Sequence, residues 1–335
     1  MTSAPTQVMP PAVVLNQMLT ASWLAQAISV SAELGVADRL AAGPLTPADL
    51  AKLTGSNAGA LYRTLRALAS AGIFRQNENG QFEQTPLSEC LRSDAPGSMR
   101  AWARACGAKW FWDMLGELNS CVRRGEKSSF NTWEYFEQNR EDGEVFNQAM
   151  TSFSASEIGP ILANYDFSGI RKLLDLAGGH GSLLAAVLEA NPGMEGVLFD
   201  APSVIEGARP LIQASKVAGR CELMAGDFFA SVPSGADAIM MKHILHDWDD
   251  ENSLKILRAC HAALPDGGKL LVIDAVIPAG NEPSVGKQLD LVMFLIGGRE
   301  RTDAEFRALF DAAGFELTRI VATPSPVSVV EGRKR

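Results

Sequence analysis

Residues 173–182 read LLDLAGGHGS, and the fold can be inferred from this short stretch. A mostly apolar run, 173–176, leads into three glycines, Gly178, Gly179 and Gly181, and a helix-forming segment follows them. Glycine lets a ligand approach the backbone closely, and the amides at the start of a helix attract negative ligand groups. The stretch therefore predicts a strand, a loop that contacts a cofactor, and a helix.

The segments that follow extend this pattern towards the C-terminus. Short apolar runs at 196–200, 222–224, 236–242 and 269–276 alternate with helical stretches. Strands that are apolar on both faces are typical of parallel sheets that helices cover on each side. We therefore predict an α/β fold, a doubly wound, Rossmann-like sheet, over 166–335.

Acidic residues follow two of the predicted strands. Asp200 ends the run at 196–200, where a carboxylate can accept hydrogen bonds from both ribose hydroxyls. Gly226, Asp227 and Phe228 follow the next run, where a carboxylate and an aromatic ring suit an adenine base. Because the glycines lack the G-x-G-x-x-G spacing, a nucleoside cofactor is favoured over a dinucleotide. The competing interpretation is a tight turn with a solvated aspartate.

The sequence MKHILHDWDDE at 241–251 begins at the carboxyl end of another predicted strand, where open α/β sheets carry their chemistry. It holds two histidines, His243 and His246, of which one could be a structural group. His246 stands immediately before a predicted helix and is the better candidate for a general base. An imidazole with a pKa near ~6.5 can take a hydroxyl proton at neutral pH.

Two carboxylates are candidates for orienting this imidazole. Asp274 lies in the run at 269–276, and Glu300 lies in GGRERT at 297–302. Thr302 begins a capping-box pattern, so Glu300 is expected just outside the start of a helix. We predict that both acids flank His246. We expect no metal, because no His/Cys cluster has zinc spacing and no carboxylate triplet suggests magnesium.

Residues 13–40, near the start of the chain, have a helical period and few charges. A helix that is apolar on most of its sides has to be buried, and its position favours burial against a second copy of the chain. This segment therefore predicts a homodimer.

The rest of the first 100 residues indicates two short helices and a hairpin. Thr46 caps the first helix, 58–71 forms the second, and the Asn-Gly pair at 79–80 marks a hairpin turn. This order is typical of a winged helix. We predict a winged-helix dimerisation domain at 1–100 and, before the sheet domain, a helical linker at 101–165.

The composition limits the partners of this 335-residue chain. Its net charge of −9 and pI near 5.1 provide no positive field for nucleic acid or anionic membranes. The first 100 residues hold seven basic and seven acidic residues, which disfavours the main alternative, a DNA-binding regulator. Five widely spaced cysteines and no apolar run near ~20 residues predict a cytoplasmic protein with reduced thiols and no membrane partner.

In combination, these segments resemble the plant caffeate-type and bacterial natural-product (hydroxyneurosporene- and phenazine-type) O-methyltransferases. The resemblance covers nearly the whole chain, and its most specific motifs are HDW at 246–248 and GGRERT at 297–302. It implies a class I methyltransferase fold, S-adenosylmethionine as cofactor and a homodimer. It also implies methyl transfer to a hydroxyl of a small, aromatic secondary metabolite, without a metal.

Matched motif by motif, the resemblance assigns further site residues. The implied cofactor contacts are Gly178, Gly179, Gly181, Asp200, Gly226, Asp227, Phe228, Lys242, Met150 and Ser154. The implied acceptor pocket consists of Phe146, Met150, Phe153, Asp247 and Met293. His246 is the implied base, with Asp274 and Glu300 beside it.

The chain departs from the family pattern at a few positions. Ala177 and His180 replace a glycine and a threonine or serine of the glycine loop, so the role of His180 stays open. Asp274 replaces a commoner glutamate and reaches less far. A further alternative, a relative that binds the cofactor without methylating, is disfavoured by the retained His246 and both acids. The chain does not reveal the acceptor's identity.

Overall fold

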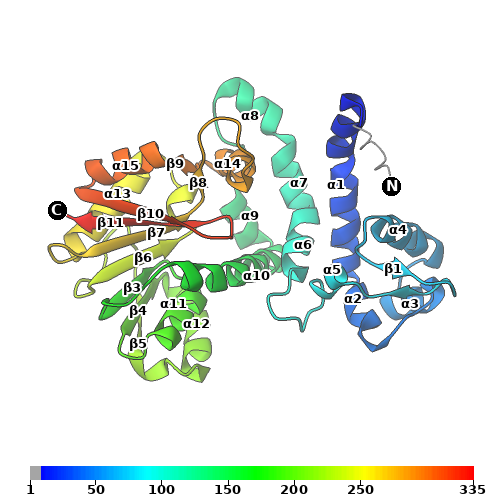
Figure 1. Cartoon of the computed structure of the whole chain (residues 1–335), viewed down its shortest axis with the longest axis horizontal. Coiled ribbons are helices and arrows are strands. Elements are labelled where there is room, and N and C mark those ends of the chain that lie inside the picture. Colours follow the sequence, from blue (N-terminus) through cyan, green and yellow to red (C-terminus); the bar gives the residue numbers. More distant parts are fainter. Residues whose placement is uncertain (1–8) are drawn as a thin grey trace, which may run out of the picture. The chain divides into compact units, whose positions relative to one another are not determined.

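The computed structural model describes residues 9–335 and divides into two compact units (Figure 1). The first unit comprises Met1–Asp113 and Trp133–Phe153, and the second comprises Met114–Thr132 and Ser154–Arg335. The helices α7 (Lys109–Gly116), α9 (Thr132–Gln138) and α10 (Arg140–Asn164) contribute to both.

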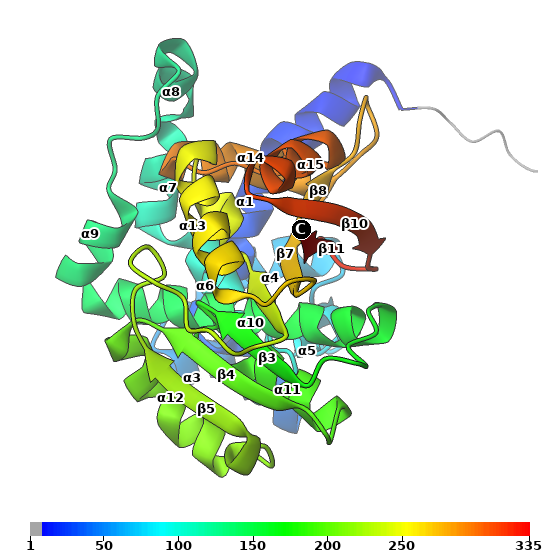
Figure 2. The same ribbon diagram turned by 90° about the vertical axis from the view of Figure 1, so that its left-hand side faces the viewer.

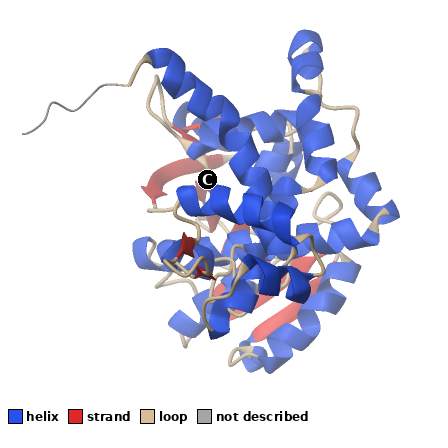
Figure 3. Cartoon of the chain, turned by 90° about the vertical axis from the view of Figure 1, so that its right-hand side faces the viewer, coloured by secondary structure: helices blue, strands red, loops and turns tan. Residues whose placement is uncertain are grey.

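Helices make up most of the first unit (Figure 3). Its other elements are α1 (Pro11–Glu33), α2 (Val36–Arg39), η1 (Leu40–Ala42), α3 (Pro47–Thr54), α4 (Ala58–Ser70), β1 (Arg75–Gln76), β2 (Phe82–Glu83), α5 (Pro86–Glu89) and α6 (Arg100–Gly107). Its core contains Leu50, Leu61, Leu65, Leu68, Phe74 and Phe82.

The predicted helices and hairpin at 46–85 are confirmed. The Thr46 hydroxyl accepts a hydrogen bond from the amide of Asp49 and so caps α3. β1 pairs antiparallel with β2, and Gly80 in the turn between them has a φ of 74°. The two strands are only two residues long each, shorter than the sequence pattern predicts.

The helical segment predicted over 13–40 consists of two helices. α1 ends at Glu33, and Gly35, with a φ of 63°, begins the separate α2. A glycine in the left-handed region ends a helix at little cost, which the apolar period did not reveal.

The helical linker predicted at 101–165 is also interrupted, within each of two helical segments, 100–125 and 133–162. α6, α7 and α8 (Leu118–Arg124) share the first segment, and α9 and α10 share the second. Ala108, between α6 and α7, has extended backbone angles. Gly125 ends α8 in the left-handed conformation. The helical period continues across the break at Ala108 because α6 and α7 are both amphipathic.

The α1 helix corrects a second expectation. By length and composition alone it is long and apolar enough to cross a membrane, and it is the only such helix among the described residues. Uncharged polar residues such as Asn16 and Gln17 interrupt its apolar run without lowering the mean hydropathy below that of a membrane span. The absence of a membrane partner therefore stays a prediction.

The second unit is built on a seven-stranded sheet in the order β10-β11-β7-β6-β3-β4-β5 (Figures 1 and 2). The strands are β3 (Lys172–Leu176), β4 (Glu195–Asp200), β5 (Cys221–Ala225), β6 (Ala238–Lys242), β7 (Lys269–Asp274), β10 (Phe315–Ala322) and β11 (Ser328–Lys334). β3 to β7 pair in parallel, and β11 joins β7 antiparallel. This confirms the predicted doubly wound α/β sheet. The chain leaves β3 towards β4 and β5 on one side and later places β6 and β7 on the other, so the switch point lies between β3 and β6.

Helices cover both faces of this sheet, as near-continuously apolar strands require. The remaining elements are α11 (Ser182–Ala190), α12 (Pro202–Ala214), η2 (Ala218–Arg220), η3 (Leu245–Asp247), α13 (Asp250–Ala263), β8 (Val276–Ile277), α14 (Val285–Ile296), β9 (Arg301–Thr302) and α15 (Asp303–Ala312). α11 and α12 pack on alternate strand residues such as Leu173 and Leu198. α13 and α15 pack on the intervening ones, such as Leu174 and Val197.

The Arg301 side chain, only 1% exposed, ties β9 to the turn that follows β6. Its guanidinium donates hydrogen bonds to the carbonyl oxygens of Leu245 (2.9 Å) and Trp248 (3.0 Å), to Ser253 Oγ (2.9 Å) and to the Asp250 carboxylate (2.8 Å). A buried cation is tolerated only when its donors are satisfied in this way.

We predict that Arg301→Met lowers the free energy of unfolding by about 3 kcal/mol or more, because it leaves two backbone carbonyls and a hydroxyl without this donor. Arg307→Met removes an exposed ion pair with Asp303 on α15 and should change it by less than about 0.5 kcal/mol. Urea unfolding of both variants measures the difference. Equal effects would show that Arg301 adds nothing beyond a surface arginine.

Candidate active site

The glycine loop lies between β3 and α11 and is closed by Asp200 at the end of β4. The Gly179 amide donates to Asp200 Oδ2 (2.8 Å), and the Ala201 amide donates to Oδ1 (2.7 Å). Gly179 has a φ of 60°. A Cβ on Gly178 would lie 2.4 Å from Asp175 Oδ2, so no side chain fits there. The structure brings these loop residues and Asp200 together, as the sequence predicted.

Asp175 is a buried carboxylate directly behind this loop. It is 2% exposed, and its Oδ2 has no hydrogen-bond partner among the described residues. Burial raises its pKa to about 7; the positive charge of Lys242 works against this rise, and the negative charge of Asp200 adds to it. Acidic groups thus outnumber basic groups around the loop, which suits a cofactor with a positive charge.

Asp227 and Phe228 follow β5 at the same edge of the sheet. Asp227 is exposed, and its Oδ1 accepts a hydrogen bond from the Phe229 amide (2.8 Å). Phe228 is half-buried and packs against the core beneath α13. A Cβ on Gly226 would lie 2.5 Å from the Phe199 ring. The Asp227 carboxylate therefore stabilises a turn. It is also exposed to solvent, so it is accessible to a nucleoside base.

A buried ion cluster follows β6. Glu157 on α10 is fully buried, and its Oε2 lies 3.0 Å from Lys242 Nζ and 2.9 Å from His243 Nε2. Burial works to raise the pKa of Glu157, but the bonds and charges of His243 and Lys242 lower it overall. His243 has a φ of 56°, in the region that non-glycine residues avoid. The cluster fixes both side chains at the carboxyl edge of the sheet.

His246 is held by Glu300, as predicted. The Nδ1 atom of His246 lies 2.8 Å from Glu300 Oε1, and both side chains are buried. Burial works to lower the pKa of His246, but the Glu300 bond and the charges of Asp274 and Asp247 raise it to about 9. The backbone amide of Glu300 donates a hydrogen bond to Asp290 Oδ1 (2.7 Å), and this bond fixes the position of Glu300.

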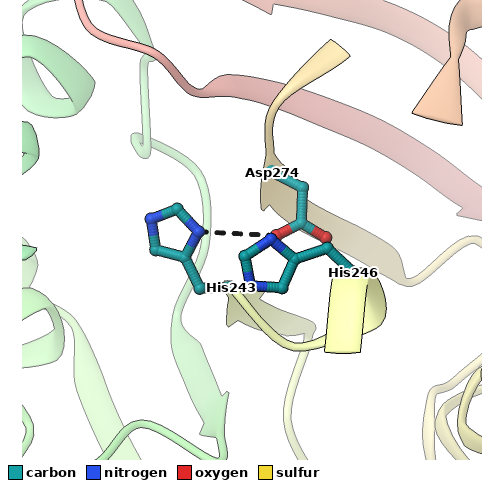
Figure 4. Close-up of side chains that lie close together, drawn as sticks. All are labelled: His243, His246 and Asp274. Carbon is teal, nitrogen blue, oxygen red and sulfur yellow. Dashed lines mark ion pairs between the residues drawn. The ribbon is translucent and has the colours of Figure 1, made fainter. Parts of the chain in front are cut away.

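Asp274 ends β7, and its carboxylate lies next to the His246 ring on the side of His243 (Figure 4). Its Oδ1 is 4.0 Å from His243 Nδ1, and neither carboxylate oxygen has a hydrogen-bond partner among residues 9–335. Burial raises the pKa of Asp274, and the nearby charge of His246 lowers it. Asp274 therefore lies near His246 but acts on it through charge, whereas Glu300 acts through a hydrogen bond.

The loop after α14 packs directly on the His246 turn. The Met293 carbonyl accepts hydrogen bonds from the amides of Gly297 and Gly298, both 2.9 Å long. A Cβ on Gly298 would lie 1.9 Å from the His246 carbonyl oxygen. On the other side of the imidazole, Asp247 Oδ1 lies 3.5 Å from Nε2. Of the predicted pocket residues, Asp247 thus lies next to the His246 imidazole, and Met293 holds the loop that packs on the His246 turn.

The remaining predicted residues are on α10. Ser154 is half-buried in the second unit, one helical turn before Glu157. Phe146, Met150 and Phe153 belong to the first unit, and their role as pocket residues stays a prediction.

His180 is exposed, and a Cβ on Gly207 of α12 would lie 3.2 Å from its Nε2, so its role stays open.

Sequence reasoning missed the roles of Glu157, Asp175 and Arg301. Glu157 could have been found, because it shares a helical face with Ser154 and the buried Ile161, at spacings of three and four residues. Asp175 and Arg301 lie within the motifs already quoted, yet no local pattern shows that a charged residue will be buried.

We predict that Asp175→Asn changes how stability depends on pH. Because the folded pKa lies above the ordinary value of 3.8, the folded state holds a proton that the unfolded chain loses between about pH 4 and 7. Wild-type stability should therefore fall by up to ~1.4 kcal/mol more per pH unit than that of the variant between pH 5 and 7, with no further divergence above pH 7.

Urea unfolding at pH 5, 6, 7 and 8 measures this difference. Asp266→Asn, at a side chain 98% exposed, is the matched control. Parallel profiles for wild type and Asp175→Asn would show that Asp175 is already ionised in the fold at pH 5.

Two family models match this chain. An O-methyltransferase domain matches 116–316, and an O-methyltransferase dimerisation domain matches 16–94. Phenazine O-methyltransferase PhzM of Lysobacter antibioticus is 40% identical over 326 residues, covering 96% of this chain and 95% of the relative. Mitomycin biosynthesis 6-O-methyltransferase of Streptomyces lavendulae is also 40% identical, over 96% of this chain and 94% of the relative.

Solved structures agree with these matches. LaPhzM superposes with a TM-score of 0.92 at 39% identity, covering 98% of this chain and all of that one. CalO1, a methyltransferase in calicheamicin biosynthesis solved in its SAH-bound form, has a TM-score of 0.87 at 36% identity, with the same coverage. With the cofactor loop, the edge histidine and the matching dimerisation domain all present, this chain belongs to the S-adenosylmethionine-dependent O-methyltransferases of natural-product biosynthesis, and its second unit has their class I methyltransferase fold.

Proposed function

We propose that this enzyme methylates a hydroxyl of a small aromatic metabolite, with His246 as the general base and without a metal. The observation that carries the proposal is the buried pair of His246 and Glu300 at the carboxyl edge of β6. In this pair, Glu300 accepts the Nδ1 hydrogen, so Nε2 of the neutral imidazole is left to take a proton.

The residues around the glycine loop are suited to hold S-adenosylmethionine, whose sulfonium supplies an already activated methyl group. We assign Asp200 to the ribose hydroxyls, Asp227 and Phe228 to the adenine, and Lys242 to a further contact. Ser154 and Met150 complete the proposed cofactor set. Burial raises the pKa of both Asp175 and Asp200, and a cationic cofactor beside them would favour their ionised forms.

His246 performs the remaining chemical step, removal of the acceptor's hydroxyl proton. The same groups that raise its pKa to about 9, Glu300 and the charges of Asp274 and Asp247, stabilise the imidazolium formed when it takes this proton. At pH 7 the neutral imidazole of His246 is therefore the minor form. Proton transfer from the acceptor to this neutral form is favourable, but only the small fraction of enzyme molecules that carry it can take the proton.

An aromatic acceptor agrees with the chemistry named in two relatives, a phenazine and a mitomycin O-methyltransferase. In the first unit, Phe146 lies in a cluster of rings with Trp110 and Phe136, and Phe153 stacks on Trp102 with ring centres 5.0 Å apart. We propose Phe146 and Phe153, within these rings, as acceptor-binding residues, and we propose Met293 and Asp247 for the same role.

We also propose a cytoplasmic homodimer that buries α1. Three large apolar side chains of this helix are exposed in the single chain: Met18 (69%), Leu19 (68%) and Trp23 (73%). Exposure of such an apolar surface to water is unfavourable. The dimerisation-domain match covers most of this helix. Burial against a second copy accounts for its membrane-like composition, and the five free cysteines agree with a reducing compartment.

We predict that the double variant Leu19→Glu, Trp23→Glu is monomeric. Two carboxylates in an apolar interface would lose their hydration without a partner charge. Sedimentation of the wild type should give twice the chain mass of 35.8 kDa, and the variant should give that mass itself. Leu211→Glu, at a residue 54% exposed on α12, should remain a dimer. A wild-type monomer at micromolar concentration would refute the dimer.

We predict that His246→Ala lowers methyl transfer by about 10²–10⁴-fold while leaving the affinity for S-adenosylmethionine within about threefold, because only a positioned base is lost. Single-turnover rates with a weakly acidic phenol, and calorimetry for the cofactor, measure the two effects. His261→Gln on α13 controls for the loss of a histidine elsewhere. A His246→Ala rate within about threefold of wild type would show that alignment of the reactants suffices.

A further inference from the structure

One carboxylate holds the side chains of two consecutive residues where β6 ends. Glu157 Oε2 accepts hydrogen bonds from Lys242 Nζ (3.0 Å) and from His243 Nε2 (2.9 Å), and Glu157 Oε1 lies 3.1 Å from the same imidazole nitrogen. Successive side chains of a regular strand point to opposite faces of its sheet. Two neighbouring residues can therefore share one carboxylate only if the chain leaves the strand conformation between them.

The core residues of β6 show which of the two side chains is turned. Met240 packs in the core cluster that contains residues of α10, and Lys242, two residues later, shares that face. Met241 packs in the core cluster of the opposite face, to which a continued strand would also direct His243. His243 instead has a φ of 56°, and this left-handed conformation brings its imidazole back to Glu157 on α10.

The left-handed conformation of His243 is strained, because the residue has a Cβ. For residues other than glycine this backbone conformation is disfavoured roughly tenfold in population. The hydrogen bond to Glu157 opposes the strain, since Glu157 is fully buried and its carboxylate is itself held by Lys242. Strained backbone persists where its surroundings impose it, and it is concentrated at functional sites.

His246 follows this strained position by three residues. The amide of His243 still donates to a carbonyl of β7, that of Ile273 (3.1 Å), so the turn leaves the sheet at His243. The two imidazole rings lie next to each other, with centres 4.9 Å apart and planes inclined by 30° (Figure 4). Arg301 holds only the later part of this turn. The conformation of His243 therefore sets the direction in which the chain leaves β6 towards His246.

We propose that Glu157 positions the base: by holding His243 in the left-handed conformation, it fixes the start of the turn that carries His246. Glu157 is then a positioning residue, because it acts on the reaction only through His243. This inference rests on the proposed function of His246 as the general base. A purely structural role would instead make Glu157 affect stability without affecting the rate of the folded enzyme.

Substitutions of His243 separate its backbone conformation from its side chain. His243→Gly and His243→Ala both remove the imidazole, but only glycine adopts the left-handed conformation without a steric penalty. In His243→Ala nothing opposes the strain, so most molecules should relax and displace the His246 turn. At saturating S-adenosylmethionine we expect the single-turnover rate of His243→Gly to exceed that of His243→Ala by about tenfold. Equal rates would overturn the proposal.

The same pair of variants tests the strain without the reaction. Inside a helix glycine is less stable than alanine, so His261→Gly on α13 should unfold at a lower urea concentration than His261→Ala. At position 243 the order should be reversed, because alanine retains the steric penalty and glycine avoids it. The helical order at both positions would show that His243 is not strained and would overturn the proposal.

Glu157→Gln tests the group that holds His243. The amide keeps the shape of the side chain, but it has no charge and its nitrogen accepts no hydrogen bond. We expect the single-turnover rate to fall about tenfold or more, because the base is displaced. Glu316→Gln, at an exposed residue of β10, should leave the rate unchanged. A Glu157→Gln rate within about threefold of wild type would contradict a positioning role.

A double variant shows whether Glu157 acts through His243. Glycine at position 243 needs no contact to stay left-handed, so in the His243→Gly background Glu157→Gln should change the rate by less than about threefold. Urea unfolding of each variant identifies any that has lost its fold. A loss in this background as large as in the wild type would show that Glu157 acts by another route.

His246→Ala separates failure of this inference from failure of the proposed function. Without the base there is nothing for the turn to misplace, so the difference between glycine and alanine at position 243 should disappear. A difference that persists in the His246→Ala background would overturn positioning of the base. A His246→Ala rate close to that of wild type would refute the base and, with it, this role of Glu157, even where the unfolding data confirm the strain.

Discussion

The catalytic edge depends on one buried cation, the guanidinium of Arg301. Its hydrogen bonds to the carbonyls of Leu245 and Trp248 run to both sides of His246, so the turn that presents the imidazole cannot move without breaking them. Arg301 also follows Glu300 directly in the chain. Arg301 therefore fixes the turn that carries His246 and also the chain position of Glu300. This keeps His246 Nδ1 at 2.8 Å from Glu300 Oε1. The rigidity that a positioned base needs thus comes from the hydrogen bonds that Arg301 donates to backbone carbonyls.

The edge of the sheet concentrates more carboxylates than a stable core would. Glu157 is balanced by Lys242, and Glu300 by His246, but Asp175 and Asp274 have buried oxygens that no donor within residues 9–335 reaches. Such groups reduce stability, and they persist where they serve a ligand or a reaction. Asp175 lies behind the cofactor loop and Asp274 beside the base. Both unsatisfied acids therefore lie where a positive charge is present only during turnover or ligand binding.

The sequence was sufficient for the five parallel strands and for most of the motif residues, because each of these strands carries its own apolar signal and each motif follows a strand end. It did not predict β10 and β11, which complete the sheet. It failed where the cause is a single backbone conformation or a contact between residues far apart in the chain. The break at Gly35 depends on one backbone conformation, and the pairing of Glu157 with Lys242 joins residues 85 positions apart. Periodicity reports which face of a helix is buried, but it does not report which buried charges meet.

The difference between His243 and His246 shows how neighbouring residues of one type acquire different roles. Both imidazoles have a carboxylate within 3 Å, yet the pKa of His243 is lowered to about 4 by burial and by the charges of Lys242 and His246, with the bond to Glu157 working against this. His246 has no such cation beside it and has three acidic neighbours, so its pKa is raised to about 9. Because His243 stays neutral, only the His246 ring takes up a proton. Lys242 therefore has a second effect besides its proposed cofactor contact, because its charge adds to burial in lowering the pKa of His243.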